Sequence, residues 1–267
     1  MDNGRKASLW LFMALAAVIA LICRALPPVP QPLSYHLFAD QRIFLGVPNF
    51  GDVVSNLPFA IIGIWGLAFL LRSRFSCNTG PFLDRRELWP YLLAFAGLLL
   101  TAFGSSYYHL APDNARLVWD RLPMTITFMS MVAAVIAERI NSRLGLIMLP
   151  VFLLVGVPSV LEWYWSETKG AGDLRFYAAV QAFSALAILL ALFLPPRYTR
   201  SSDFGLVLGF YALAKALELF DVRVFAALHI GGHTLKHLAA AAAGYCILRM
   251  LEKRKPLTHP RPAGPSP

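Results

Sequence analysis

Long apolar segments are the feature that most restricts how this chain can fold. The hydrocarbon core of a bilayer is about 30 Å thick, and a helix needs roughly 20 apolar residues to cross it. Of the 267 residues 57% are hydrophobic and only 15% are charged, which is more apolar surface than a soluble domain can bury. We therefore expect an all-α integral membrane protein. The eight segments that we expect to span are residues 8–26, 51–72, 89–110, 118–138, 143–163, 174–195, 204–220 and 232–251.

The first apolar segment can be interpreted in two ways. It follows Arg5 and Lys6, as the apolar part of a cleaved signal peptide would. Its apolar run is long, however, and prolines follow it where a cleavage site with small residues would be expected. We favour a retained helix, so residues 1–26 are predicted to be an extra transmembrane helix and residues 27–251 a seven-helix domain. The tail, residues 252–267, is rich in proline and polar residues and is predicted to be disordered.

The basic residues predict the orientation of these helices. The formal net charge of +9 would raise the question of nucleic acid binding in a soluble protein. Here the lysines and arginines alternate with the membrane segments, as the positive-inside rule describes, and no nucleic acid partner is expected. Both termini are predicted to be cytoplasmic. The basic segments contain Arg5, Lys6, Arg72, Arg74, Arg85, Arg86, Arg139, Arg143, Arg197, Arg200, Arg249, Lys253, Arg254 and Lys255.

A first cluster of polar residues lies where two apolar segments meet. Ser105 and His109 are four residues apart near the end of one segment, so they share one helix face. The chain then turns back through a short connection, and Asp120 stands near the start of the next segment at a similar depth. A charged side chain in the middle of a membrane helix costs about 2.5–3.5 kcal/mol, so such residues are candidates for function.

A second cluster opens the last apolar segment. His233 and His237 are four residues apart, a spacing at which both imidazoles can point at one cation, although this pair alone is a weak signal. The predicted topology puts His109 on the same side of the membrane. We therefore predict a zinc ion held by His109, His233 and His237, with water in an open fourth position. Such water loses a proton near pH 7; Asp120 could accept that proton and Ser105 could stabilise an oxyanion.

Each of these residues also has a simpler interpretation. Ser105 could serve only to let two helices pack closely, as small residues do in membranes. Asp120 could form an ion pair with Arg116 or Arg121. Lys215 and Glu218 are three residues apart and are interpreted first as an ion pair inside the membrane and second as part of a site.

Taken together, these residues resemble one family of membrane enzymes. Ser105 and His109, then Asp120 followed by Leu-Pro-Met, and finally the pair His233 and His237 match the pattern of the alkaline ceramidases. That family belongs to a superfamily that includes the adiponectin receptors. The segment from Asn49 to Phe59 is also similar to the first family helix, and the resemblance covers about residues 36–251.

The resemblance implies a function and a location. A member of this family is a zinc-dependent hydrolase that cleaves the amide bond of ceramide, or of a related long-chain lipid amide, by attack of zinc-bound water. The predicted protein is therefore a bacterial inner-membrane enzyme with its site near the outer, periplasmic face and a ceramide-like lipid as its partner. A second possible function is a seven-helix lipid receptor with a structural zinc and little turnover. A third is a transporter, but the sequence shows no repeat or broken helix of the kind found in transporters.

The chain also departs from the family pattern. Family members carry an acidic calcium-binding segment before and within the first core helix. Asp40, Asn49 and Asp52 stand in the equivalent region and are predicted as ligands of a second cation, Ca²⁺. Lys236 precedes the last histidine, where an aromatic residue is common, and Arg121 follows Asp120, where an acidic residue is common. Both changes lie close to the site, so a long-chain amide other than ceramide would suit the same chemistry.

Overall fold

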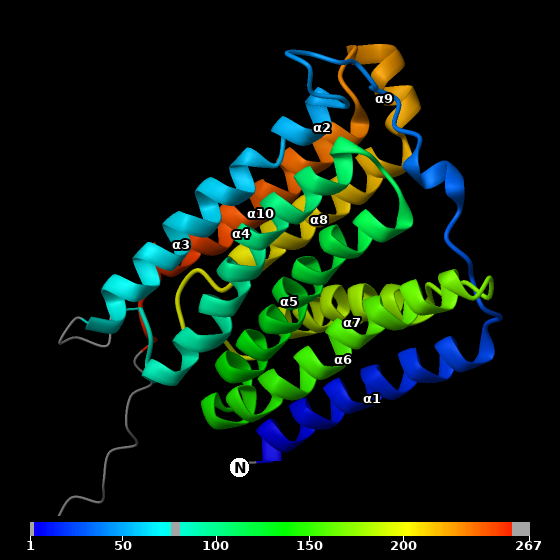
Figure 1. The fold of residues 1–267 in the computed structure, drawn as a ribbon. Coiled ribbons are helices and arrows are strands. Elements are labelled where there is room, and N and C mark those ends of the chain that lie inside the picture. The colour runs from blue at the N-terminus through cyan, green and yellow to red at the C-terminus, as the bar shows by residue number, and fades with distance from the viewer. Residues whose placement is uncertain (1–2, 76–80, 258–267) are drawn as a thin grey trace, which may run out of the picture.

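Helices make up nearly all of the regular structure in the computed structural model, which describes residues 3–75 and 81–257 (Figure 1). Within those residues the extended pairings are two isolated bridges, at Phe44–Val47 and Tyr198–Pro256. The longer elements are α1 (Asn3–Ala25), α2 (Phe50–Val54), α3 (Leu57–Phe75), α4 (Leu88–Leu110), α5 (Asn114–Arg139), α6 (Ser142–Thr168), α7 (Arg175–Leu192), α8 (Asp203–Leu219), α9 (Asp221–Leu228) and α10 (Gly232–Lys253), with short 3-10 helices at Leu33–His36 and Arg85–Glu87.

Each predicted apolar segment corresponds to one long helix or to a helix pair. The second segment is divided into α2 and α3, and the other seven correspond to α1, α4, α5, α6, α7, α8 and α10. Within the described residues, six helical stretches are long and apolar enough to cross a membrane, and α8 and α10 are not among them. The chain is thus a helical membrane protein. The count of seven helices plus one remains a prediction.

Short capped turns make the central helices antiparallel neighbours. The Asp113 carboxylate accepts a hydrogen bond from the Arg116 backbone N–H at 2.7 Å and so caps α5, and Asn141 caps α6 in the same way through Leu144. Such caps satisfy N–H groups that lack a partner at a helix start. In Figure 1 α5 lies in the middle of the molecule, and it packs against α4, α6 and α7. Helix α1 packs against α7 at the edge and exposes most of its apolar surface.

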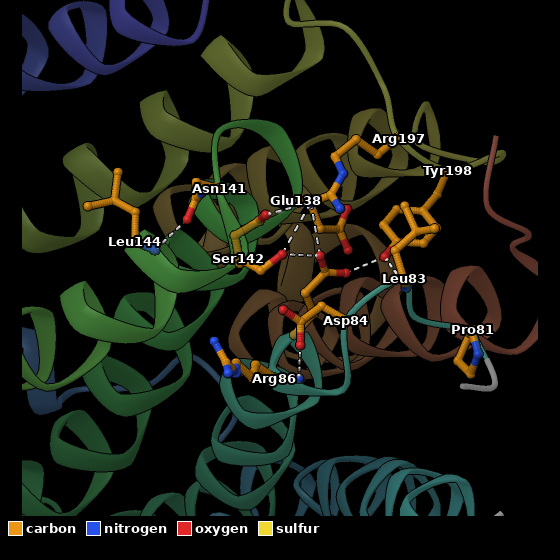
Figure 2. A network of polar contacts seen from close by, with 12 residues as sticks. Pro81, Leu83, Asp84, Arg86, Glu138, Asn141, Ser142, Leu144, Arg197 and Tyr198 are labelled. Carbon is orange, nitrogen blue, oxygen red and sulfur yellow. Dashed lines mark hydrogen bonds and ion pairs between the residues drawn. The ribbon is translucent and has the colours of Figure 1, made fainter. Parts of the chain in front are cut away.

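A buried polar network ties the chain together at the start of α4. Glu87 is completely buried and accepts hydrogen bonds from Ser142 at 2.6 Å, from Arg197 at 2.9 Å and from Tyr198. Figure 2 shows Ser142, Arg197 and Tyr198 pointing toward the centre of this network. It therefore joins segments that are more than 100 residues apart in sequence at one end of the bundle.

The first residues of the predicted tail are ordered rather than disordered. Arg254 is 4% exposed, forms an ion pair with Glu138, and lies 4.1 Å over the Tyr198 ring. The Thr199 N–H donates to the Lys255 carbonyl at 2.9 Å, and this pairing continues from the 197–199 segment to residue 257. Composition predicted disorder from residue 252, but a buried arginine anchors the chain to residue 257. Residues 258–267 lie outside the described part of the chain.

Candidate metal centre

The three predicted histidines come together at one end of the bundle. His109 is in the last turn of α4, while His233 and His237 are in the first turns of α10. One ligand nitrogen from each ring lies within 4.8 Å of the other two, and the residues are 0%, 4% and 4% exposed. The predicted clustering is confirmed, and this buried triad could hold a metal ion.

The hydrogen bonding of the imidazoles fits a metal. Both ring nitrogens of His109 are buried and have no hydrogen-bond partner among the described residues. Leaving buried polar atoms unpaired costs about 1–3 kcal/mol each, and a cation at the centre of the triad would give one of these two nitrogens a partner. The Ser55 hydroxyl donates to the Asp52 carbonyl at 3.1 Å, so it accepts from Nδ1–H of His237 at 2.8 Å. That bond leaves the Nε2 lone pair of His237 available to a metal.

Other side chains that hold the triad in place were not predicted from the sequence. The Phe38 ring packs 4.6 Å from the rings of both His109 and His233. Asp221 accepts from the His233 backbone N–H at 2.9 Å and from the Ala39 N–H at 2.9 Å, which fixes the outer loop against the start of α10. Ser55 could have been suspected, because it is a polar residue in an apolar segment of the sequence. Phe38 and Asp221 gave no such signal.

The close approach of α4 to α5 brings the two predicted catalytic residues beside the triad. A β-carbon on Gly104 would overlap the backbone carbonyl of Trp119, so glycine is needed at this contact. Ser105 and Asp120, next to these two residues, are 1% and 7% exposed, and both line the same cavity as His237. The Ser105 hydroxyl lies beside the Asp120 carboxylate and has no other hydrogen-bond partner among the described residues.

The alternative partners proposed for Asp120 are engaged elsewhere. Arg116 pairs with Asp113 and donates to the Ala111 carbonyl at 2.9 Å. Arg121 donates to the side-chain oxygen of Gln31 at 2.6 Å. Within the described chain, neither arginine forms an ion pair with Asp120, which lines the cavity.

The cavity beside the triad is long and mostly apolar. Its volume is about 530 Å³, and its lining comes from six of the long helices. Ser105, Asp120 and His237 lie at one end, and apolar residues such as Met131, Ile188 and Ile247 lie farther along the bundle. A cavity with one polar end and apolar walls is suited to a ligand with one long hydrocarbon chain.

The ion pair predicted between Lys215 and Glu218 is present, and a third residue joins it. The Lys215 ammonium lies 2.5 Å from Glu218 Oε2, and the Lys236 ammonium lies 2.5 Å from Glu218 Oε1. All three side chains line the cavity. The pair is therefore a structural contact and a part of the cavity wall at the same time.

The residues predicted for a second cation have protein partners. Asp40 is 4% exposed and accepts from Arg42 through both oxygens, at 2.7 and 2.6 Å, which lowers the pKa of its carboxyl. Asn49 donates to the His109 carbonyl at 2.9 Å, and Asp52 accepts from Thr234 at 2.6 Å. The second cation stays a prediction.

The fold and the histidines define a class of protein: a helical membrane protein with a buried three-histidine cluster that could hold a metal ion. No protein-family model matches the chain, and neither a curated protein nor a solved structure matches it.

Proposed function

We propose that this protein is a zinc-dependent intramembrane hydrolase that cleaves the amide bond of ceramide or of a related long-chain lipid amide. One observation carries the proposal: a buried cluster of three histidines contributes His237 to the polar end of a mostly apolar cavity of about 530 Å³. A resemblance to the alkaline ceramidases supports an amide as the bond that is cleaved. The residues that carry this resemblance are Ser105, His109, Asp120, His233 and His237.

The ligand set favours zinc over a harder cation. Three imidazole nitrogens and no carboxylate suit zinc, and three protein ligands leave a fourth position open. When bound, zinc polarises a carbonyl and makes water nucleophilic at neutral pH. His109, His233 and His237 would hold the ion, with Ser55 orienting His237 through its other nitrogen.

Asp120, Ser105 and the apolar cavity wall would have separate roles in the hydrolysis. Asp120 would accept a proton from the attacking water and pass it to the departing amine. Ser105 would donate a hydrogen bond to the oxygen of the scissile carbonyl, because it lines the cavity beside Asp120. The apolar length of the cavity would bind the acyl chain and keep bulk water away.

The positive-inside pattern supports a placement in the membrane. With seven core helices and α1 as an extra helix, the basic loops lie in the cytoplasm and the triad lies near the outer face. In a bacterium this is the periplasmic side of the inner membrane. A lipid substrate would then enter directly from the bilayer.

Metal analysis combined with a lipid screen tests this function. Protein purified in detergent should contain about one zinc per chain and should release fatty acid from ceramide or another long-chain amide. Folded protein without zinc would contradict the proposal. A lipid bound tightly for hours without cleavage would favour a receptor instead.

Replacing Ser55 by alanine should weaken zinc binding by about 10–100-fold, because it removes the group that orients His237. A competition titration with a chromophoric chelator measures the affinity. Ser73→Ala is a matched control, since the Ser73 hydroxyl donates to the Phe69 carbonyl one turn away in the same helix. Equal zinc affinity in the two variants would show that the bond from His237 to Ser55 does not support the metal.

A further inference from the structure

Basic side chains stand out in the wall of an otherwise apolar cavity. Arg121, Lys215 and Lys236 line it, and only two carboxylates, Asp120 and Glu218, accompany them in the described lining. The wall therefore carries one more positive than negative charge before any metal is added. A cavity for a neutral hydrocarbon needs no such excess, because buried charges are costly.

Arg121 is held in place but keeps a donor without a partner. Its guanidinium carbon lies 4.2 Å from the ring centroid of Trp163 and 4.7 Å from that of Tyr177. One terminal nitrogen donates to Gln31 at 2.6 Å. The other, Nη1, is buried and has no hydrogen-bond partner among the described residues, although Arg121 is only 4% exposed. A fixed guanidinium with a free donor is well suited to bind an anion.

Lys236 belongs to the same end of the cavity as Arg121. Its ammonium lies 3.4 Å from Nε2 of His233 and 2.5 Å from Glu218. Tyr35 connects the two cations, because its hydroxyl donates to the same Glu218 oxygen at 2.9 Å and its ring centroid lies 5.6 Å from the Arg121 guanidinium. Lys236 is thus next to the histidine triad, and Arg121 is connected to Lys236 through Tyr35 and Glu218.

We propose that Arg121 and Lys236 recognise a carboxylate on the substrate close to the scissile amide. This inference rests on the proposed amide hydrolysis and names its substrate class as N-acyl amino acids with a long acyl chain. The acyl chain would occupy the apolar length of the cavity, and the amino acid carboxylate would face the two cations. Hydrolysis then adds the oxygen of water to the carbonyl carbon, breaks the C–N bond and transfers a proton to nitrogen, giving a fatty acid and an amino acid.

Two substrates that differ mainly in charge test the proposal. N-oleoylglycine carries the carboxylate, and N-oleoylethanolamine has the same acyl chain and a neutral end. The wild-type kcat/KM should favour N-oleoylglycine by about 10–100-fold, the range expected for a hydrogen bond between charged groups. Arg121→Gln should lower the ratio by about 10-fold, since Lys236 remains, while Arg121→Lys, which keeps the charge, should lower it less.

Arg116→Gln is the matched control. It removes the same charge from the same helix, but Arg116 pairs with Asp113 at the surface and does not line the cavity. This variant should keep the wild-type ratio. Lys236→Gln gives a second test should Arg121→Gln fail to fold, provided that its zinc content is measured as well.

A binding measurement separates this inference from the hydrolysis itself. In zinc-loaded Asp120→Asn protein, calorimetry should show that N-oleoylglycine binds at least about 10-fold more tightly than N-oleoylethanolamine and that Arg121→Gln reduces the difference. That result would support the anion site even if neither amide were cleaved. Equal binding of both lipids, binding of neither lipid, or a preference that Arg121→Gln leaves unchanged would overturn it, and cleavage of ceramide would still stand.

Discussion

Replacing His233 by alanine should remove the metal and with it all lipid hydrolysis. His233 supplies one of three ligand nitrogens that lie within 4.8 Å of one another, and the described chain offers no fourth histidine, cysteine or carboxylate in that cluster. Two imidazoles cannot hold zinc with the affinity of three, so the zinc content should fall from about one per chain toward zero. Elemental analysis of purified protein and an assay of fatty acid release measure the two losses.

A nearby histidine provides the control for this variant. His229 ends α9 in a left-handed backbone conformation, with φ of 56°, and its carbonyl accepts from Arg42. His229→Asn suits that conformation and should keep zinc and activity. If folded His233→Ala protein retained a full zinc ion, the triad would not be the metal site, and the proposed function would lose its basis.

The sequence was sufficient to predict the triad because residue spacing and the order of the membrane segments place its three histidines. His233 and His237 share a helix face by their spacing, and the end of α4 returns to the start of α5 through a short capped turn. The alternation of basic loops then assigns His109 to the same end of the bundle. These steps use helix periodicity, which gives the face of each residue, and membrane topology, which is predicted from hydropathy and loop charge.

The supports of the triad could not be predicted in this way, because they join distant segments. Ser55 reaches His237 across 182 residues, and Asp221 fixes a loop that precedes α2. Phe38 lies in that loop, where no periodicity indicates which side chain points inward. Such contacts depend on how the helices pack, and the sequence alone does not give that packing.

The position of the Arg121 side chain also could not be predicted from the sequence. The sequence has a basic residue where the alkaline ceramidases carry an acidic one, and it allows an ion pair of Asp120 with either Arg116 or Arg121. In the structure the side chain lies over Trp163 and Tyr177 and donates to Gln31. Aromatic neighbours from other helices, rather than the adjacent carboxylate, determine its position.

Replacing Asp120 by asparagine should lower turnover by about 10²–10⁴-fold while the protein keeps its zinc. Asp120 is 7% exposed and lines the cavity together with Ser105 and His237, but it is not one of the three clustered ligands. Asparagine has nearly the same shape and cannot accept a proton as a carboxylate does. Measuring kcat and zinc content on the same preparation separates loss of the base from loss of the metal.

Asp113→Asn is the matched control for this prediction. It makes the same chemical change seven residues earlier, at the start of the same helix, and asparagine caps a helix about as well as aspartate. Its turnover and zinc content should match the wild type. If Asp120→Asn lost zinc in proportion to activity, Asp120 would support the metal rather than accept a proton. Unchanged turnover would instead require another base, and Glu218 is the remaining carboxylate in the described cavity wall.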